Sequence, residues 1–206
     1  MPVLGKTKKE VVSEFRCHEI LSAARSVFAR NGYNAATVDD IADAAGVAKG
    51  TLYLYFPSKR EIFVETFRAG VIDLQAEVAR DMAAEADAPA KIRAFVRTRL
   101  AYAERNRDFV RVYYTEFNNM LIQPPHVGAE FQDLYHQQAN VLAEVIRSGI
   151  AAGQIRPVEP IAAARIVYDM TRGLIAQRLL GWSDRPAEDD ADFLFELILK
   201  GIGCQQ

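Results

Sequence analysis

The stretch from Thr37 to Lys59, TVDDIADAAGVAKGTLYLYFPSK, limits the possible folds more than any other part of the chain. Thr37 is a good N-cap, and the two aspartates after Val38 place negative charge where the first turn of a helix favours it. Gly46 stands where a residue with positive φ would end that helix. A second short helix, residues 49–55, fits between this turn and the proline that follows. The stretch therefore predicts two short helices, a tight turn between them and the start of a third.

The spacing within this stretch is that of a helix-turn-helix. Ala42 lies four residues before Gly46, and its small side chain lets the second helix cross closely over the first. Apolar residues follow at Val47 and Leu52, where the motif has buried aliphatic side chains. For the bare pattern the alternative is an ordinary helical hairpin, in which the glycine is only a C-cap and the polar residues are merely solvated.

The outward face of the second helix carries groups that suit DNA. Lys49 can neutralise a phosphate, Gly50 allows close backbone approach, and Thr51 can hydrogen-bond a base edge or a phosphate. Tyr53 offers a phenolic donor, and Tyr55 is also available to a partner. We therefore expect a short recognition helix for the major groove of a double-stranded DNA operator.

Over a longer run, this stretch resembles the DNA-binding domain of the tetracycline-repressor (TetR) family of bacterial regulators. The resemblance extends from about Glu14 to Phe67, and the residues that carry it are Thr37–Ala42, Ala45–Val47, Gly50–Phe56 and Ser58–Lys59. It implies that DNA is contacted by Thr37, Lys49, Thr51, Tyr53, Tyr55 and Lys59. The chain departs from the family at Ala48, where a serine or threonine often caps the recognition helix, and this puts a side-chain phosphate contact there in doubt.

Charge is distributed unevenly along the 206 residues, although the net charge is only −2. Residues 1–60 contain nine Lys and Arg against six Asp and Glu, whereas the remaining residues contain sixteen against twenty-one. Basic charge is therefore concentrated around the predicted DNA-binding unit. Lys6, Lys8 and Lys9 precede the expected first helix and could form a flexible arm that reaches phosphates, or a solvated tail.

Several classes of function are not expected. No apolar run is long enough to span a bilayer and the N-terminus lacks the apolar segment of a signal peptide, so we expect a cytoplasmic protein without a membrane partner. Cys17 and Cys204 lie far apart and lack metal-ligand spacing, so no disulfide, metal or cofactor is expected. An enzyme is not expected either, because no nucleophile–histidine pair, glycine-rich phosphate loop or paired-carboxylate signature stands out.

The rest of the chain predicts helices and no convincing strand. A first helix runs from about Glu14 to Asn31, and a capping box at Ser58 and Glu61 begins a long helix that continues to Met82. Further helices are predicted at residues 90–106, 109–120, 126–148, 160–182 and 188–202. The predicted fold is all-α, with about nine helices. It comprises a three-helix helix-turn-helix domain (1–57), a connecting helix (58–88) and a helical bundle for ligand binding and dimerisation (89–206).

Side chains from several C-terminal helices are candidates for the lining of a ligand cavity. The candidates are Phe109, Tyr113, Phe117, Met120, Phe131, Tyr135 and Tyr168, with Arg172 and Gln177 as polar anchors. The alternative is that these side chains simply fill the core. The TetR resemblance implies a helical bundle that usually holds a small effector, but no ligand-binding residue can be carried over because sequence there is highly divergent.

A two-fold homodimer is expected on physical grounds, because one short recognition helix reads too few base pairs for useful affinity. Apolar faces on the last two helices would pair as a four-helix interface across the dimer, in agreement with the family resemblance. The residues expected in this interface are Leu174, Ile175, Leu179, Phe193, Leu194, Leu197 and Ile198.

These features together predict a ligand-responsive transcriptional regulator, a repressor that binds a palindromic operator and is released by an unidentified small-molecule effector. The effector would displace the helix that begins at Ser58 and change the distance between the two recognition helices, which must match one DNA turn of about 34–36 Å. One alternative is an architectural or adaptor protein of the same fold without an effector. Another, a helical-bundle enzyme, would need titratable groups clustered in the cavity.

Overall fold

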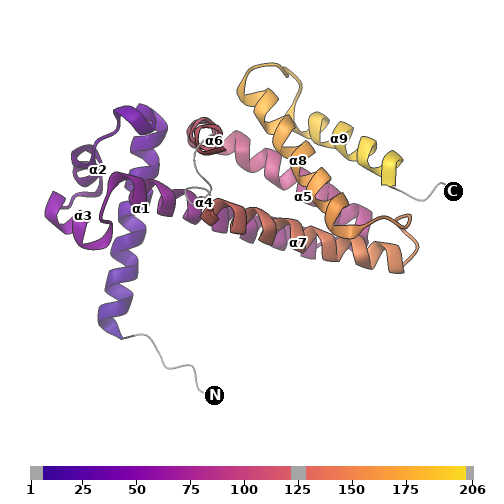
Figure 1. The fold of residues 1–206 in the computed structure, drawn as a ribbon, viewed down its shortest axis with the longest axis horizontal. Helices are drawn as coiled ribbons and strands as arrows, with labels where there is room; N and C mark the ends of the chain where they lie inside the picture. Colours follow the sequence, from indigo (N-terminus) through magenta and orange to yellow (C-terminus); the bar gives the residue numbers. More distant parts are fainter. Residues whose placement is uncertain (1–6, 122–128, 203–206) are drawn as a thin grey trace.

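The computed structural model describes the backbone of residues 7–121 and 129–202, and the side chains of residues 7, 10–115 and 135–201. Over these ranges the chain forms nine α-helices and no strand, which confirms the all-α prediction. None of the described helices is long and apolar enough to cross a membrane. Helices α1 to α3 form one group and α5 to α9 another, with α4 running from the first group into the second (Figure 1).

The N-terminal group has the predicted helix-turn-helix. Its helices are α1 (Lys8–Ala35), α2 (Val38–Ala45) and α3 (Lys49–Tyr55). Thr37 and Asp40 form a capping box that starts α2. Gly46 then takes the left-handed conformation, with φ of 65°, and its N–H donates to the carbonyls of Ala42 and Asp43. Both short helices and the turn between them lie where the sequence placed them.

The first helix is longer than expected. A capping box between Thr7 and Glu10 starts α1 at Lys8, so Lys8 and Lys9 belong to its first turn. The prediction of a flexible arm is therefore wrong for these two lysines, and Lys6 lies outside the described residues. The capping box was missed although Val11, Val12 and Phe15 follow it at helical spacing, and the side chains of these three residues are more than half exposed. The glycine at the other end of the predicted helix, Gly32, does interrupt it, with φ of 73°.

The core of the N-terminal group fixes which face of α3 points outward. Leu52 of α3 is fully buried with Ile20 and Phe28 of α1, Ile41 of α2 and Phe63 of α4. The rings of Phe28 and Phe63 meet edge to face, with their centroids 5.3 Å apart. Because this inner face is occupied, Lys49, Tyr53 and Leu54 on the opposite side of α3 are exposed to a partner.

The C-terminal group is a helical bundle around a separate core. It consists of the distal part of α4 (Lys59–Ala83) with α5 (Ala88–Arg105), α6 (Arg107–Leu121), α7 (Ala129–Ala151), α8 (Pro160–Leu179) and α9 (Ala187–Ile202). Ser58 caps α4 by accepting a hydrogen bond from the Glu61 N–H at 3.1 Å, which is one of the two hydrogen bonds of the predicted capping box. Among the most deeply buried core residues are Ile92, Leu100, Leu142, Ile146 and Ala164.

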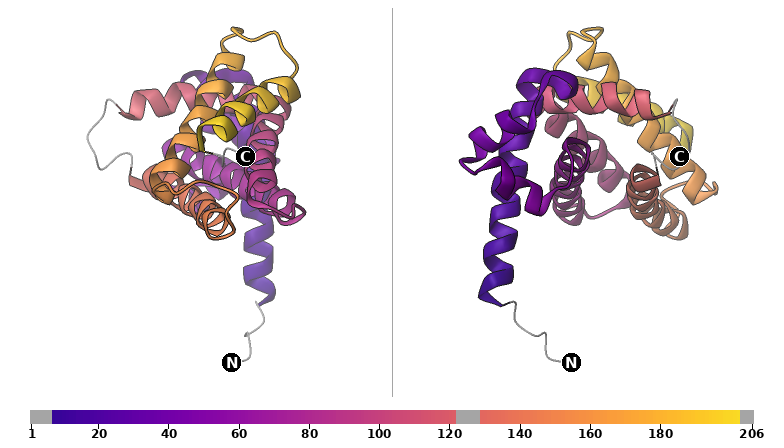
Figure 2. Two further views of the ribbon diagram at one scale, coloured as in Figure 1. Left: turned by 90° about the vertical axis from the view of Figure 1, so that its right-hand side faces the viewer. Right: turned by 60° about the vertical axis from the view of Figure 1, so that its left-hand side comes forward.

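A small third core joins the two groups. Val64, Phe67 and Val71 of α4 pack with Phe109 of α6 and with Ala29 of α1. Figure 2 shows α6 reaching from α1 across the bundle, and α1 packs against both α4 and α6. The two groups are therefore connected by side-chain packing as well as by the length of α4.

Candidate DNA-binding surface and effector region

The outer face of α3 presents polar, aromatic and apolar groups together. Tyr53 is 46% exposed, and Lys49 and Gly50 are exposed at the start of the helix. A Cβ added at Gly50 would meet no atom within 4 Å, so packing inside the chain does not require this glycine. Because glycine within a helix costs about 1 kcal/mol relative to alanine, its presence agrees with the predicted close approach of a partner.

Leu54 is a candidate contact that sequence reasoning did not select. Its side chain is 83% exposed and lies on α3 directly after Tyr53. An apolar side chain on a recognition helix can contact the methyl group of a thymine. The available signal was the position of Leu54 outside the buried pattern set by Leu52 and Phe56.

Lys49 is held at the start of α3 by an exposed ion pair. Its Nζ donates to Asp39 Oδ2 at 2.8 Å, and this hydrogen bond raises the pKa of Lys49. Such a solvated pair contributes little to stability, so a DNA phosphate can compete with Asp39 for the ammonium group. Ala48 gives α3 no side-chain cap, in agreement with the departure noted in the sequence.

The Lys59 ammonium is already bound within the chain. Its Nζ donates to the backbone oxygens of Tyr33 at 2.9 Å, Asn34 at 3.2 Å and Ala36 at 2.9 Å. It also lies 4.7 Å from the centroid of the Tyr33 ring. These carbonyls mark the C-terminal end of α1, where a cation is favoured. Lys59 therefore ties the start of α4 to the end of α1. Because its three N–H donors are engaged there, the predicted phosphate contact would require Lys59 to give up one of these carbonyls.

The remaining predicted DNA contacts lie around this face. Thr37 is exposed, and its hydroxyl accepts from the Asp40 N–H at 3.1 Å in a capping box that lowers the pKa of Asp40. Thr51 is partly buried. Tyr55 is also partly buried and packs against the domain core, with its ring centroid 6.5 Å from that of Phe56. Of the predicted contacts on α3, Lys49, Gly50 and Tyr53 are therefore the most exposed to solvent.

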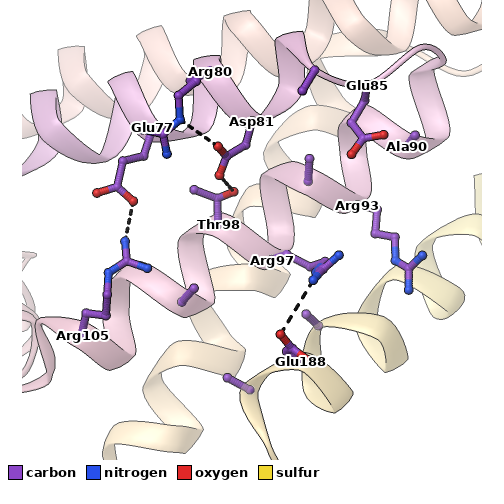
Figure 3. A pocket seen from close by; sticks show the side chains of 15 residues that line it. Glu77, Arg80, Asp81, Glu85, Ala90, Arg93, Arg97, Thr98, Arg105 and Glu188 are labelled. Carbon is purple, nitrogen blue, oxygen red and sulfur yellow. Dashed lines mark hydrogen bonds and ion pairs between the residues drawn. The ribbon is translucent and has the colours of Figure 1, made fainter.

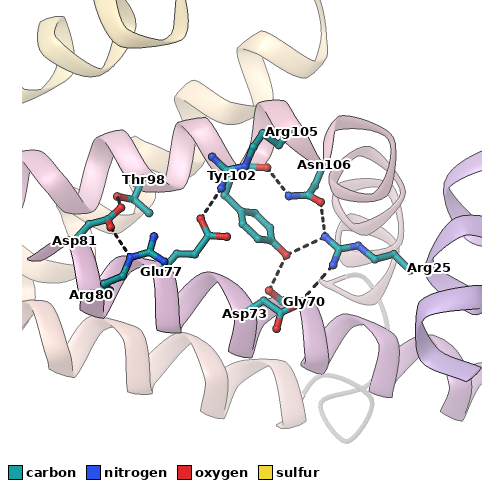
Figure 4. A network of polar contacts seen from close by, with 10 residues as sticks. All are labelled: Arg25, Gly70, Asp73, Glu77, Arg80, Asp81, Thr98, Tyr102, Arg105 and Asn106. Atoms are coloured by element: carbon teal, nitrogen blue, oxygen red, sulfur yellow. Dashed lines mark hydrogen bonds and ion pairs between the residues drawn. The ribbon is translucent and has the colours of Figure 1, made fainter. Parts of the chain in front are cut away.

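A polar network connects α1 to α4 and α5 (Figure 4). Arg25 Nη2 donates to the Tyr102 hydroxyl at 2.9 Å and to Asn106 Oδ1 at 2.6 Å. The Tyr102 hydroxyl in turn donates to the Gly70 carbonyl at 2.9 Å, and Arg25 Nη1 lies 3.7 Å from Asp73 Oδ2. One guanidinium in the DNA-binding group therefore contacts two helices of the bundle.

Aromatic packing encloses this network. The Arg25 guanidinium lies 4.8 Å from the centroid of the Phe109 ring. A Cβ at Gly70 would come within 3.3 Å of Phe109 and 3.4 Å of the Tyr102 hydroxyl, so this glycine lets the aromatic rings approach α4. Phe109, expected to line a ligand cavity, instead packs in the small core between the two groups.

Four of the predicted effector residues come together between α6, α7 and α8: Tyr113, Tyr135, Tyr168 and Arg172. The Tyr113 ring also stacks on Phe67 of α4, with centroids 4.0 Å apart, and so borders the small core that holds Phe109. The rings of Tyr135 and Tyr168 meet edge to face with centroids 4.8 Å apart. Burial raises the pKa of Tyr113 above its usual range, and both Tyr168 and Arg172 act on it electrostatically. Gln177 is exposed and does not join them. The side chains of Phe117, Met120 and Phe131 lie outside the described residues.

Two further groups in this region were missed by sequence reasoning. Tyr114 donates to the Arg172 carbonyl at 3.1 Å, and burial raises its pKa to about 12. Arg99 of α5 is only 5% exposed, and its guanidinium lies 4.2 Å from the centroid of the Tyr168 ring. Arg99 stands four residues after Phe95 on the buried stripe of α5, a spacing that could have identified it.

A groove of about 700 Å³ lies between α4, α5 and α9 (Figure 3). Its charged lining residues are Arg80, Arg93, Arg97 and Arg105 with Glu77, Asp81, Glu85 and Glu188. Arg105 pairs with Glu77, and Arg97 lies 3.8 Å from Glu188. The Thr98 hydroxyl donates to Asp81 Oδ2 at 2.7 Å, which lowers the pKa of Asp81. Because acids and bases balance and pair, this groove is a polar surface on the outward side of α5.

α8 and α9 expose apolar side chains at helical spacing. The exposed fractions are 60% for Ile166, 36% for Met170, 50% for Phe193 and 48% for Leu197. Trp182, just after α8, is 75% exposed. We call Ile166, Met170, Phe193 and Leu197 the α8–α9 apolar face. Two of its members, Phe193 and Leu197, were expected in a dimer interface, whereas Ile166 and Met170 were missed.

Other residues expected in the dimer interface belong to the core of the single chain. Ile175, Leu194 and Ile198 are each 5% exposed, and Leu174 and Leu179 are partly buried against the same core. Their expected role is therefore corrected for the three buried residues, whose side chains are not accessible to a partner. The physical reason is that α9 carries apolar residues on both faces, so periodicity alone does not separate inward from outward positions.

Comparison with known proteins places the chain in a family. Residues 20–66 match the family described as bacterial regulatory proteins, tetR family, and residues 85–176 match a tetracyclin repressor-like C-terminal domain. The HTH-type transcriptional repressor KstR2 of Mycobacterium tuberculosis (strain ATCC 25618 / H37Rv) is 31% identical over 140 residues, which is 68% of each chain. The chain belongs to the TetR family.

Other proteins are similar to this chain over most of its length. The fatty acid metabolism regulator protein of Bacillus subtilis is 25% identical over 188 residues, 89% of this chain and 94% of the relative. FadR from Bacillus subtilis, in complex with stearoyl-CoA, has a TM-score of 0.79 at 23% identity and covers 90% of this chain and 98% of its own. A protein from Saccharomonospora viridis in complex with choline has a TM-score of 0.81 at 25% identity, with coverage of 94% and 100%.

Membership of the TetR family explains the two parts of the molecule. The helix-turn-helix of α2 and α3 falls within the first matched segment, and α5 to most of α8 falls within the second. The chain is therefore a DNA-binding, ligand-responsive transcriptional regulator.

Proposed function

We propose that this TetR-family regulator is a repressor that binds a palindromic operator as a homodimer and is released by an acyl-containing effector. The observation that carries the proposal is the hydrogen-bonded link from Arg25 of the DNA-binding group to Tyr102 of the bundle. The name of KstR2 as a transcriptional repressor supports the direction of regulation. In this proposal residues 1–57 bind DNA, residues 58–88 connect, and residues 89–206 bind the effector and the second subunit.

The DNA contacts proposed are those of the open face of α3. Lys49 binds a phosphate after leaving Asp39, Gly50 and Thr51 allow close approach, and Tyr53 and Leu54 reach base edges. At the margins, Thr37, Tyr55 and Lys59 remain proposed contacts. Operator affinity then depends on salt through the basic groups and on base sequence through α3.

The homodimer is proposed to form through the α8–α9 apolar face. Ile166 and Met170 stand one helical turn apart on α8, as do Phe193 and Leu197 on α9, so each helix offers a continuous apolar strip. Pairing these strips with their symmetry copies would remove apolar surface from water and produce a four-helix interface. Leu174, one turn after Met170 on α8, and Leu179 are partly buried against the core of the single chain.

The effector is proposed to carry an acyl chain. The Bacillus subtilis relatives support this class, because one is named a fatty acid metabolism regulator and the solved FadR holds stearoyl-CoA. In this chain we place the effector beside Tyr113, Tyr135 and Tyr168, with Arg172 as a neighbouring polar group. The alternative of an adaptor without an effector is not favoured, because the solved relatives hold small ligands.

Release would follow from movement of α5 and α6. An effector between α6, α7 and α8 would shift α5, and Tyr102 and Asn106 would transmit that shift to Arg25 in α1. The distance between the two α3 helices of the dimer would change, and a mismatch with one DNA turn would cost contacts at one half-site. By linkage, effector and operator each lower the affinity of the protein for the other.

The experiment is selection of bound DNA from a random pool, followed by fluorescence anisotropy on the enriched sequence. We expect a palindrome with half-sites one helical turn apart, and at least a fivefold weaker operator affinity with lauroyl-CoA, about 1 kcal/mol of coupling. A promoter fusion should gain activity when the regulator is deleted. Binding without sequence preference would refute the regulator proposed here, and loss of promoter activity on deletion would refute repression.

A further inference from the structure

Arg99 is a buried cation without a carboxylate partner among the described residues. Its side chain is 5% exposed, and its Nη1 donates to Oε1 of the neutral Gln138 amide on α7. Its Nε has no hydrogen-bond partner in the described part of the chain. A buried charge paired only with a neutral amide is unfavourable in the free protein. A ligand oxygen that accepts from Nε would reduce this cost.

The groups around Arg99 define what that ligand offers. The guanidinium lies 4.2 Å from the Tyr168 ring centroid and 5.3 Å from that of Phe95, so aromatic faces enclose it. The Tyr114 hydroxyl is committed to the Arg172 carbonyl, and the Tyr135 hydroxyl donates to Asp169 Oδ2 at 3.0 Å. Asp169 also lies 3.7 Å from Arg172. Asp169, the nearby carboxylate, is thus already engaged, whereas the Nε–H of Arg99 is still available to donate a hydrogen bond.

We infer that Arg99 binds the acyl oxygen of the effector, a carboxylate or thioester carbonyl that accepts from its Nε. This inference rests on the proposed acyl effector, and it assigns recognition of the polar end of that effector to Arg99. Aromatic rings alone would also suit a quaternary ammonium group. A second cation beside Arg99 would be repelled in this low-dielectric site, so a choline-like effector is disfavoured here.

The test introduces a carboxylate into the protein at the place where the effector oxygen would meet Arg99. Gln138→Glu changes one atom type and places a carboxylate at the Arg99 guanidinium. We expect a higher Tm for the free variant, because the buried charge gains a counter-ion, and at least tenfold weaker binding of laurate and lauroyl-CoA. Gln137→Glu is the matched control, since it adds the same charge at an exposed neighbour on α7. It should bind both probes as the wild type does.

Two further arms separate the sources of the oxygen and guard against misfolding. Laurate presents a carboxylate and lauroyl-CoA a thioester carbonyl, while coenzyme A alone presents neither beside an acyl chain. Arg99→Met keeps the buried volume without the charge and should fold with an unchanged or higher Tm while losing the same probes. Binding measured by thermal shift and calorimetry gives both readouts on the full chain.

The outcomes distinguish this inference from the proposed function. If Gln138→Glu and Arg99→Met bind laurate and lauroyl-CoA like the wild type, the assignment of Arg99 is wrong while the acyl-responsive repressor stands. If the wild type binds its operator but neither acyl probe, or binds choline or coenzyme A alone instead, both the inference and the acyl class are wrong. Absence of any sequence-specific operator would refute the regulator itself.

Discussion

The guanidinium of Arg25 in α1 donates to the hydroxyl of Tyr102 in α5 at 2.9 Å, although the two residues are 77 positions apart in the chain. The same hydroxyl donates to the Gly70 carbonyl of α4, and so one oxygen joins three helices. Two of these helices belong to the bundle and one to the DNA-binding group. This oxygen is therefore placed to report a movement of α5 to the helix that carries the recognition unit.

Removing that oxygen should weaken communication more than folding. Tyr102→Phe keeps the buried ring but removes one hydrogen bond from Arg25, which still donates to Asn106, and one from the Gly70 carbonyl, at a cost of about 1–2 kcal/mol in the free energy of unfolding. We expect the effector-dependent change in operator affinity to fall toward unity, while operator affinity without effector changes little. Anisotropy titrations with and without lauroyl-CoA, with urea unfolding alongside, measure both effects.

Thr98→Val is the matched control for this experiment. It removes a hydroxyl that also bridges α5 to α4, through Asp81, but has no connection to α1. A stability loss of similar size with full effector response is expected for this variant. Equal loss of response in both variants would mean that general loosening of α4 against α5, and not the contact with Arg25, causes uncoupling.

The two lysines at the edges of the recognition unit should behave differently. Lys49→Met removes an exposed ion pair and one phosphate contact from each subunit of the proposed homodimer. It should leave Tm nearly unchanged and lower the magnitude of the slope of log affinity against log salt by about 2. Lys59→Met leaves three carbonyls at the end of α1 without their donor and should lower the free energy of unfolding by about 1–2 kcal/mol. Thermal unfolding and salt-dependent anisotropy separate the two effects.

If Lys59→Met unfolds at the wild-type temperature, the hydrogen bonds from Lys59 to the end of α1 do not contribute to the stability of the fold. A change of base preference on Lys49→Met would contradict the phosphate contact, because phosphates carry no sequence information.

The contrast between these lysines shows how far sequence reasoning reaches. The helix-turn-helix was predictable because its determinants are local: Gly46 ends α2, Ala42 lies four residues before it, and Thr37 caps the helix. The exposure of Tyr53 followed from the same spacing. By contrast, Lys59 contacts carbonyls more than twenty positions away in the sequence, and no local sequence pattern predicts that contact.

The effector region was less predictable for the same reason. Its aromatic residues could be nominated, but the separation of Phe109, which joins the two groups, from Tyr135 and Tyr168 depends on how helices distant in sequence pack. Arg99 was overlooked because a charged residue is ordinarily assigned to the surface. Its burial is visible only once α7 and α8 cover it.

The buried tyrosines predict a loss of stability at high pH. The pKa values of Tyr114 and Tyr135 are each raised to about 12, by burial first and, for Tyr135, also by the hydrogen bond to Asp169. In the unfolded chain a tyrosine titrates near a pKa of about 10. Between pH 10 and 12 the folded state therefore keeps protons that the unfolded state has lost, so stability is full below pH 10 and falls as pH rises toward 12.

Tyr114→Phe should reduce this alkaline loss by removing one of the tyrosines whose pKa is raised by burial. Urea midpoints from pH 8 to 11.5, with tyrosinate absorbance followed in parallel, provide the measurement. Tyr53→Phe, at an exposed tyrosine on α3, is the reference variant. A pH dependence that is identical in Tyr114→Phe and the wild type would contradict the raised pKa of Tyr114.

The last prediction concerns the α8–α9 apolar face. Leu197→Glu places a charge on a half-exposed position of this face and, in the proposed dimer, buries it without a partner, which is strongly unfavourable. We expect sedimentation at micromolar concentration to show a dimer for the wild type and a monomer for the variant. Operator affinity should fall by more than about tenfold, because each α3 then reads its half-site alone.

Val141→Glu provides the matched control, since Val141 is an apolar residue of α7 that is 55% exposed and lies outside this face. The control should remain dimeric and bind the operator as the wild type does. Dissociation by Leu197→Glu but not by Val141→Glu assigns the interface to α8 and α9. Dimers that persist in Leu197→Glu would move the interface elsewhere, and a wild-type monomer would remove the two-fold arrangement on which the proposed reading of a palindrome depends.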